Sequence, residues 1–425
     1  MAGKKVYLLD EVYGISRDVP LNYVERNSVD SVLRRSLQRG RHITIFGSSK
    51  QGKTCLRKHC LNDSQYIVVQ CSNKWALSDL NAHILKQAGY ELTESTKMSI
   101  SGKAKLIATI KSKFFPVEAG IEGQMEEGKE SETTYRQLEL DIDDANDVIA
   151  ALREIGFSKY IVLEDFHYLK QEVQKDFSIE LKAFHENSKL CFVIVGVWLD
   201  ENKLVIYNGD LTGRTVSVNA DAWDDSELIE VIEKGAKLLN VTFNQTFISS
   251  LLNECNGNVY MVQEACYRVC EMEDIAETQE VTREVGENCD AKDIVKNIVK
   301  EQSGRYNSFI TNYASGFQET TLEMHRWLLY PILTATTGEL MEGLSYRSIR
   351  VALEQVHPRR GELNPGNVTQ ALKSVVSLQL SKSIQPIILD YDESNSKLHI
   401  VDRGFVIWLK AQDRAEIMEL AGLPY

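Results

Sequence analysis

Residues 47–54 read Gly-Ser-Ser-Lys-Gln-Gly-Lys-Thr, which matches the pattern G-x-x-x-x-G-K-[ST] in full. The apolar, β-branched run 42–46 precedes them, and a helix can begin at residue 54. In this context the glycines let backbone N–H groups curve around a phosphate, and the helix N-terminus adds partial positive charge. The segment therefore predicts a phosphate-binding loop, or P-loop, in an α/β domain.

The residues at the end of this loop have separate roles in the prediction. Lys53 would reach the β- and γ-phosphates of a nucleoside triphosphate, and the Thr54 hydroxyl would hold Mg²⁺. ATP or ADP, together with Mg²⁺, are therefore the expected cofactors. The loop residues expected to contact the nucleotide are Gly47, Ser48, Ser49, Lys50, Gln51, Gly52, Lys53, Thr54 and Cys55.

Further short apolar runs predict a parallel sheet around the P-loop strand. These runs span 67–69, 160–163 and 191–195, and helical patterns lie between them at 77–88 and 145–155. Short, continuous apolar runs are typical of strands buried on both faces, so their alternation with helices indicates an α/β sandwich. The expected fold class is an α/β P-loop NTPase sandwich, and the expected core domain spans residues 1–221.

Two carboxylates directly follow one of the predicted strands. Glu164 and Asp165 come after the run 160–163, at the carboxyl end of a strand, where the sites of parallel α/β proteins gather. A P-loop needs an acidic partner there to order Mg²⁺ and the attacking water. We assign Glu164, with Thr54, to the Mg²⁺ shell and Asp165 to polarising the water. Because the Asp side chain is shorter than Glu, we expect slow hydrolysis.

An arginine near the end of the predicted core completes the expected catalytic set, which also holds Lys53, Glu164 and Asp165. Arg214 follows Gly213, well after the last predicted strand at 191–195. In that place it can act as an arginine finger on the nucleotide of a neighbouring subunit. It can equally form a salt bridge within its own domain, and the sequence leaves both readings open.

The segment 92–140 departs from the α/β pattern. It holds Gly102, Gly120, Gly123 and Gly128 and the acidic stretch 118–132. We interpret it as an exposed hairpin or loop inserted into the core and more typical of a solvated insertion than of a functional site.

Beyond the core, the pattern predicts two further domains. Residues 222–300 show amphipathic helical spacing, beginning with a cap at 224–226, and predict a small helical lid domain. Residues 301–425 show helices at 322–333, 345–355 and 367–380, followed by a β-hairpin at 386–401. Three helices followed by a hairpin are the plan of a winged helix.

Composition excludes several classes of protein. The chain has 425 residues, 43 % of them hydrophobic and 26 % charged, which is ordinary for a globular protein of two to four domains. Its formal net charge of −13 argues against a protein that coats nucleic acid or anionic membrane through its bulk charge. There is no run of 18 apolar residues and no stretch suited to a signal peptide, so no membrane partner is expected. The 8 cysteines form no C-x-x-C pair. Reduced thiols in a cytoplasmic protein are the simplest interpretation.

The negative charge is unevenly distributed. Basic and acidic residues balance in 325–425, so the net charge belongs to the preceding residues. Within 345–382 the acidic residues are Glu354 and Glu362, and the basic ones are Arg347, Arg350, Arg359, Arg360, Lys373 and Lys382. These cations could contact DNA phosphates, but the third helix offers few polar side chains for reading bases. DNA binding and protein docking by the winged helix therefore both stay open.

Taken with two further segments, these motifs resemble those of a known family. The chain resembles AAA+-type P-loop ATPases of the branch shared by STAND switch proteins and origin-recognition-complex initiators. Residues Tyr23, Val24 and Arg26 resemble its adenine-pocket segment, and Cys255–Val259 resembles the G-x-P motif of STAND lids, with Val259 in place of proline. No arginine occupies the position at which this family carries its lid sensor.

The resemblance implies an ATP-dependent switch that forms homo-oligomers with ATP and signals to an effector protein, with antiviral or mobile-element systems as a setting. One alternative is an initiator-like or loader-like ATPase that binds DNA through its winged helix. A second is a scaffold that binds nucleotide without hydrolysing it. No nuclease or protease signature occurs in the sequence, so the output would act through a partner protein or through DNA.

Overall fold

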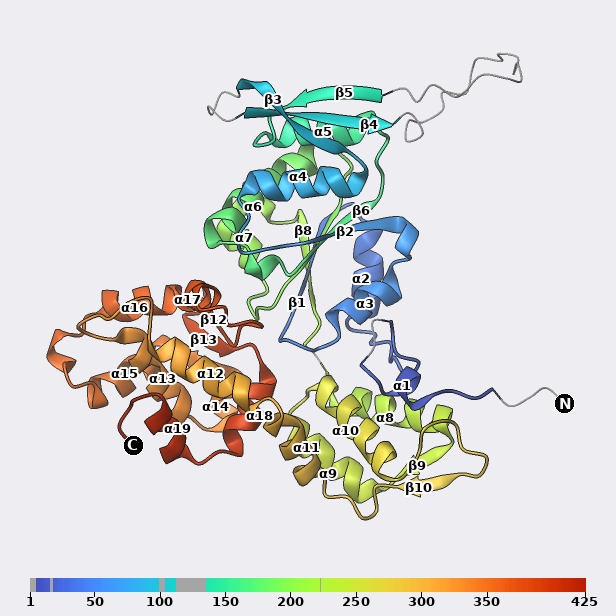
Figure 1. Ribbon diagram of the computed structural model, residues 1–425, viewed down its shortest axis with the longest axis vertical. Helices are drawn as coiled ribbons and strands as arrows, with labels where there is room; N and C mark the ends of the chain where they lie inside the picture. Colours follow the sequence, from blue (N-terminus) through green and yellow to red (C-terminus); the bar gives the residue numbers. More distant parts are fainter. Residues whose placement is uncertain (1–4, 16–17, 99–103, 112–134, 222) are drawn as a thin grey trace.

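The central sheet has five parallel strands in the order β2-β6-β7-β1-β8 (Figure 1). The computed structural model describes residues 5–15, 18–98, 104–111, 135–221 and 223–425. The strands are β1 His42–Phe46, β2 Tyr66–Gln70, β6 Tyr160–Glu164, β7 Phe192–Val195 and β8 Thr215–Asn219. All four predicted strands are confirmed, and β8 is an addition that the sequence analysis did not identify.

Helices cover both faces of this sheet. The residues Ile43, Val162 and Val193 pack under α2 and α3 on one face, whereas Ile161, Leu163 and Ile194 pack under α4, α5 and α6 on the other. The helices are α2 Asp30–Leu37, α3 Lys53–Cys60, α4 Leu77–Ala88, α5 Ala145–Glu154, α6 Gln171–Asn187 and α7 Lys203–Tyr207. Because neighbouring residues of a strand point to opposite faces, each strand contributes to both cores. The expected α/β sandwich is confirmed.

The insertion contains more β-structure than the predicted hairpin or loop. Strands β3 Glu91–Met98, β4 Ala104–Lys111 and β5 Tyr135–Leu140 form a separate antiparallel sheet in the order β3-β4-β5. This sheet lies over α4 and α5, at the end of the core farthest from the C-terminal domains (Figure 1). Ala108, Ile110 and Leu140 are buried against the core, which explains why the segment is ordered there. The predicted acidic stretch 118–132 lies outside the described residues.

The lid is a helical domain that also takes in the start of the chain. Its elements are α8 Asp225–Leu239, β9 Val241–Phe243, α9 Gln245–Cys255, α10 Val259–Met272, β10 Arg283–Val285 and α11 Ala291–Lys300. Helix α1, Leu9–Val12, packs on α8 and α10, and the Tyr13 hydroxyl donates to the Ile232 carbonyl at 2.5 Å. The first residues of the predicted core therefore contact the lid.

The C-terminal domain has the winged-helix arrangement. Its elements are α12 Ser303–Ala314, α13 Met324–Thr334, α14 Thr337–Glu342, β11 Leu344–Ser345, α15 Tyr346–Val356, α16 Pro365–Lys373, α17 Val375–Ser381, β12 Leu389–Asp392, β13 Lys397–Ile400, α18 Arg403–Lys410 and α19 Arg414–Leu420. The strands form one antiparallel sheet, β11-β13-β12. The predicted third helix is in fact two, because the Ser374 backbone, with φ −96° and ψ 4°, ends α16 before α17 begins.

Short 3-10 turns connect several of these elements: η1 Asp63–Gln65, η3 Phe166–Tyr168, η4 Gly209–Leu211 and η5 Arg360–Glu362. None of the 8 cysteines forms a disulfide. Over the described ranges, every helix is too short or too polar to cross a membrane.

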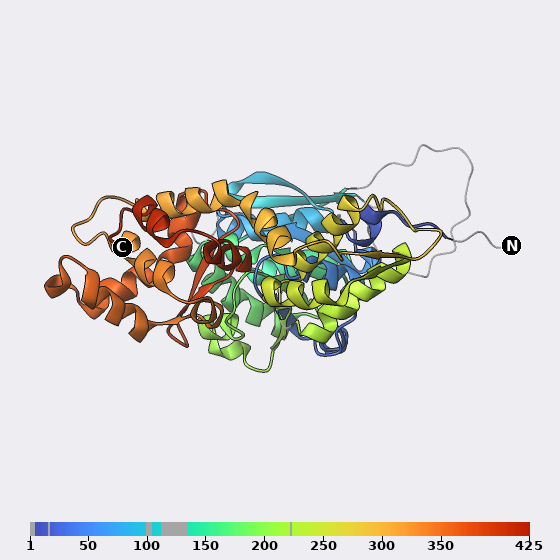
Figure 2. The same cartoon turned by 90° about the horizontal axis from the view of Figure 1, so that it is seen from below.

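The lid and the winged helix lie side by side below the core (Figures 1 and 2). One continuous apolar cluster joins them and includes Leu251 of the lid with Phe405 and Trp408 of α18. A smaller cluster, formed by Val197, Ile387 and Val401, joins the core to the winged helix. The winged helix therefore contacts both other domains.

Candidate functional site

The P-loop connects β1 to α3 in a conformation that requires its glycines. Gly47 has φ +144° and Gly52 has φ +79°, both in the region that favours glycine. A Cβ at Gly47 would also lie 3.0 Å from the Asp221 backbone nitrogen. Lys50 has φ +62°, so the backbone curves through most of the loop. This is the local geometry that the sequence pattern predicted.

Lys53 points back into the loop. Its ammonium donates to the carbonyls of Gly47, at 3.0 Å, and of Ser48, at 2.6 Å. Burial lowers the pKa of Lys53 to about 8, and the charges of Asp221, Glu164 and Asp165 act in the opposite direction. The structure therefore brings the predicted lysine and both predicted carboxylates into one electrostatic neighbourhood.

Asp221 holds the first part of the loop. Its Oδ1 accepts the Ser48 N–H at 3.1 Å, and its Oδ2 accepts the Ser48 hydroxyl at 3.1 Å. The sequence analysis missed this residue. It lies two positions after β8, at the carboxyl edge of the sheet beside β1. The signal that could have found it is an acidic residue just beyond a strand adjacent to the P-loop strand.

The winged helix reaches the P-loop directly. The Ser49 N–H donates to the Val401 carbonyl at 2.8 Å. Arg403, at the start of α18, forms an ion pair with Asp221 at 2.7 Å and donates to the lid carbonyls of Asn256, at 2.9 Å, and Gly257, at 3.2 Å. One side chain thus connects all three domains beside the loop. No local pattern around Arg403 predicts this, because its partners are far away in the sequence.

The two predicted carboxylates lie at the end of β6 in different surroundings. Glu164 is buried and forms an ion pair with Arg57 of α3 at 2.8 Å. Asp165, with φ +55°, accepts a hydrogen bond from Gln70. Burial and then the charge of Glu164 raise the pKa of Asp165. Arg57 is a second residue that the sequence analysis missed. It lies one helical turn after Lys53, so the two residues share a helix face.

The segment compared with an adenine pocket packs beside the P-loop. Tyr23 donates to Asp30 at 2.6 Å, and Val24 is buried in the cluster shared with the lid. The Arg26 guanidinium donates to the Ala220 carbonyl at 2.9 Å and lies 3.9 Å from the centre of the Trp223 ring. Burial lowers the pKa of Arg26. Trp223 is a third residue that the sequence analysis missed, and it lies where the chain passes from core to lid.

Two further P-loop residues face the lid side. Lys50 lies 3.9 Å from the centre of the Tyr260 ring on α10, and the Trp223 indole donates to the Gln51 carbonyl at 3.4 Å. Both polar side-chain atoms of Gln51 are buried and lack a hydrogen-bond partner among the described residues. Buried polar groups normally have partners, so an unpaired amide in this loop fits a polar ligand bound there. Cys55 and Thr54 follow on α3, where Thr54 is exposed.

Arg214 lies at the opposite edge of the sheet from the P-loop. Its carbonyl accepts the His42 N–H at the beginning of β1, at 3.0 Å. Its guanidinium forms an ion pair with Glu186 at 2.8 Å. Because the parallel strands run from this edge toward the P-loop, Arg214 is remote from the P-loop of its own chain.

Metal ligands are few at this site. Among the described residues, no group of three or more His, Cys, Asp or Glu side chains could hold a metal ion. The residues that the sequence assigned to Mg²⁺, Thr54 and Glu164, lie on α3 and at the end of β6. A P-loop holds Mg²⁺ by few protein groups together with substrate phosphates, so this arrangement fits such a metal.

A search of solved structures found chains with the same arrangement. The Walker-type ATPase PABY2304 of Pyrococcus abyssi aligns over 94 % of this chain and 99 % of its own, with 12 % identity and a TM-score of 0.50. This chain has the fold of a Walker-type ATPase. The expected order of P-loop core, helical lid and winged helix is confirmed.

Other solved structures belong to the groups named by the sequence resemblance. The Aeropyrum pernix ORC2 protein covers 97 % of this chain and 96 % of its own, with 14 % identity and a TM-score of 0.47. The STAND protein PH0952 from Pyrococcus horikoshii covers 97 % of this chain but 46 % of its own, with 11 % identity and a TM-score of 0.39. A scan against models of protein families and a search of curated proteins found no match.

Proposed function

We propose that this protein is an ATP-dependent molecular switch whose winged helix docks on the P-loop in one of its states. The observation that carries the proposal is the hydrogen bond from the Ser49 N–H to the Val401 carbonyl, next to the Arg403–Asp221 ion pair. A P-loop binds phosphate through its backbone N–H groups. A carbonyl of another domain on this loop therefore couples the position of that domain to the nucleotide.

The residues near the loop fit a nucleotide with Mg²⁺. Lys53 would contact the phosphates, and Thr54 with Glu164 would hold the metal ion. When bound, Mg²⁺ would neutralise charge on the phosphates. Arg57 holds Glu164 in place at 2.8 Å, and Gln70 orients Asp165, the residue proposed to polarise water. Tyr23, Val24 and Arg26 would border the base.

The proposal extends to assembly and signalling. Arg214 is too far from its own P-loop to act there, so a role as an arginine finger would have to be on a second copy of the chain. The ion pair with Glu186 would then have to open. An effector protein as the partner and an antiviral or mobile-element setting rest on the sequence resemblance, and a cytoplasmic location rests on the free cysteines.

A DNA-binding ATPase is the second candidate. Three of the six basic residues noted in 345–382 form ion pairs, Arg350 with Glu354, Arg359 with Glu362 and Lys373 with Glu393. Within the described ranges, Arg347, Arg360 and Lys382 have no such pair, so they are the groups available for phosphate contacts. This candidate uses the same nucleotide site and differs in the partner of the winged helix. A scaffold that binds nucleotide without turnover stays the third.

The test of nucleotide binding is Lys53→Ala in the full chain. We expect ATP affinity to fall by at least about tenfold, because hydrogen bonds to charged groups contribute about 1.5–3 kcal/mol. Lys86→Ala, an exposed lysine of α4, is the matched control. Isothermal titration with ATP and Mg²⁺ measures both variants. Equal affinities in Lys53→Ala and wild type would contradict the proposal.

A further inference from the structure

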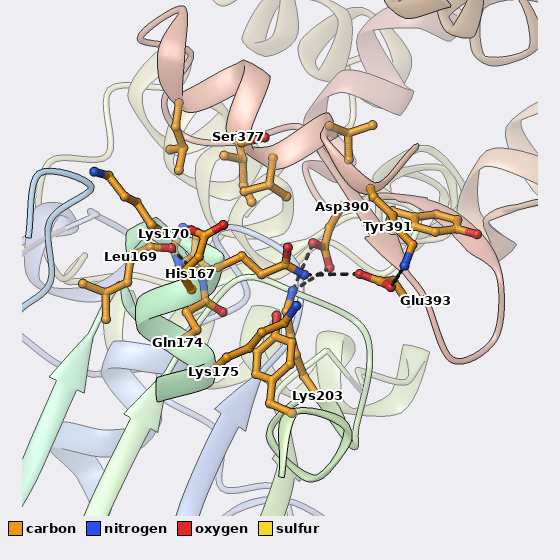
Figure 3. Close-up of a pocket in the computed structure, with 18 of the residues that line it drawn as sticks. His167, Leu169, Lys170, Gln174, Lys175, Lys203, Ser377, Asp390, Tyr391 and Glu393 are labelled. Carbon is orange, nitrogen blue, oxygen red and sulfur yellow. Dashed lines mark hydrogen bonds and ion pairs between the residues drawn. The ribbon is translucent and has the colours of Figure 1, made fainter. Parts of the chain in front are cut away.

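A large cavity lies between the core and the winged helix. Its volume is about 620 Å³, within the ~300–1,000 Å³ typical of small-molecule sites, which often occur at domain interfaces. Figure 3 shows His167, Lys170 and Gln174 on the core side and Ser377 and Tyr391 on the winged-helix side. The P-loop residues 47–54 do not line it, so it is distinct from the nucleotide site.

Buried polar atoms on the core side of the cavity lack partners. His167 Nδ1 accepts the Val197 N–H at 3.3 Å, which leaves the proton on Nε2, and that nitrogen has no partner among the described residues. Burial lowers the pKa of His167 well below its usual value, so the ring is neutral. Gln174 donates to the Leu169 carbonyl at 2.7 Å, whereas its Oε1 is likewise unpaired within the described part of the chain. These side chains are 2 % and 5 % exposed.

The charges that line the cavity leave two cations available. Asp390 forms an ion pair with Lys203, and Glu393 forms one with Lys373. Over the described ranges, Lys170 and Lys175 form no ion pair within 4.0 Å. Lys170 is also the N-cap residue of α6, and its side chain accepts no hydrogen bond from the first backbone N–H groups of that 17-residue helix. Those N–H groups therefore add positive potential at the start of the helix.

Two further carboxylates, those of Asp200 and Glu172, also line the cavity. Asp200 accepts the Asn202 N–H at 2.9 Å, and burial raises the pKa of Asp200. Glu172 lies at the exposed rim. The winged-helix side contributes an apolar patch, formed by Val376, Leu380 and Ile387, beside the charged side chains already named. The cavity thus combines two lysines outside ion pairs on the core side with an apolar patch on the winged-helix side.

We propose that this cavity is a binding site for a small organic anion with an apolar or aromatic body. The anionic group would contact Lys170, Lys175 and the first amides of α6, and the body would lie against Val376 and Leu380. Because both domains contribute walls, an occupant would stabilise their docked arrangement, in which Val401 contacts the P-loop. This last consequence rests on the proposed switch.

The test uses 8-anilinonaphthalene-1-sulfonate, an aromatic sulfonate of the required chemistry, with the full chain. We expect saturable binding of one molecule per chain, weakened about tenfold by Lys175→Glu and by Leu380→Trp, which would fill the cavity. Lys189→Glu, an exposed lysine just after α6, is the matched control and should bind like wild type. Circular dichroism and melting curves identify any variant that fails to fold.

Two results would overturn the proposal. One is binding that does not saturate or is seen only at high probe concentration, which indicates an adventitious additive only. The other is equal affinity in wild type, Lys175→Glu and Leu380→Trp. The Lys53→Ala variant distinguishes the two sites, because it should lose affinity for ATP and keep its affinity for the sulfonate. If ATP does not change the affinity of wild type for the sulfonate, the binding site is supported and its proposed coupling to the switch is contradicted.

Discussion

Arg403 is the residue through which the three domains meet. Its guanidinium contacts Asp221 of the core and the carbonyls of Asn256 and Gly257 of the lid, while its backbone begins α18 of the winged helix. The ion pair with Asp221 is largely buried, with side-chain exposures of 17 % and 8 %. Buried charged pairs are costly to break from one side. The docked arrangement should therefore depend on this side chain.

Replacing Arg403 by Ala should loosen the winged helix from the P-loop. We expect association of a fluorescent ATP analogue to become about three- to tenfold faster, because the docked state loses on the order of 1 kcal/mol. Stopped-flow fluorescence measures the rate. Arg350→Ala removes an exposed ion pair of α15 and serves as the control. An unchanged or slower rate in Arg403→Ala would mean that docking does not restrict nucleotide entry.

Glu180 gives the core a pH dependence that is independent of the P-loop. Its carboxyl group is buried beside Asn81, and burial raises the pKa of Glu180 to about 8. The folded state therefore holds the proton more tightly than the unfolded state, whose pKa is near 4.3. Stability is highest below the unfolded pKa and falls as the pH rises toward 8.

Glu180→Gln should remove this loss of stability at high pH. We expect the variant to gain stability over wild type, by a few kcal/mol at pH 8.5, and to melt at nearly the same temperature as wild type at pH 4.5. Thermal melts at both pH values, followed by circular dichroism, measure the difference. Glu186→Gln, an exposed residue of the same helix, should not change the pH profile. A constant offset between Glu180→Gln and wild type at all pH values would contradict the assignment.

At the scale of elements, the sequence analysis identified strands that form continuous apolar runs, but it missed a strand in which apolar and polar residues alternate. The runs at β1, β6 and β7 were found because these strands are buried on both faces, and β2, an edge strand, was found because its apolar run is continuous. Strand β8, at the other edge, reads Thr-Val-Ser-Val-Asn, in which apolar and polar residues alternate, so it has no continuous apolar run. The break between α16 and α17 was missed because both parts have the same helical spacing.

The first turn of α8 depends on the cap that the sequence indicated. The Asp224 carboxylate accepts the Glu227 N–H at 2.8 Å, and Glu227 bonds back to the Asp224 N–H at 3.2 Å. Asp224→Ala should destabilise the lid, since it leaves a helix-end N–H without its acceptor. Urea denaturation measures this loss. Asp225→Ala, at the next position, should cost less, and an equal cost would contradict the capping role.

At the scale of the whole molecule, the winged helix decides which surfaces are free. It covers the P-loop through Val401 and borders the core cavity through α17 and β12. Arg214 is at the far edge of the core, away from these contacts. A second copy of the chain is therefore the partner through which Arg214 could reach a nucleotide.

Mass measurement in solution tests assembly. We expect the mass to rise with ATP, and Arg214→Ala to lower turnover about a thousandfold per site while ATP binding is retained. Arg153→Ala, a surface arginine bonded to the Asn187 carbonyl, is the control. If Arg214→Ala and Arg153→Ala both remain monomeric and hydrolyse ATP as fast as wild type, Arg214 is not an arginine finger.

Adding duplex DNA at two salt concentrations tests the second candidate function, a DNA-binding ATPase, whose affinity for DNA should fall steeply as the salt concentration rises.

The sequence by itself determined the P-loop, the neighbouring carboxylates at Glu164 and Asp165, and the order of three domains. Those features depend on local patterns, namely glycine spacing, apolar runs and helical periodicity, which the chain carries within short windows. The tertiary structure alone decided that Asp221, Arg57, Trp223 and Arg403 gather at the loop and that a cavity lies between the core and the winged helix. These contacts join residues distant in sequence, and only the packing of complete domains brings such residues together.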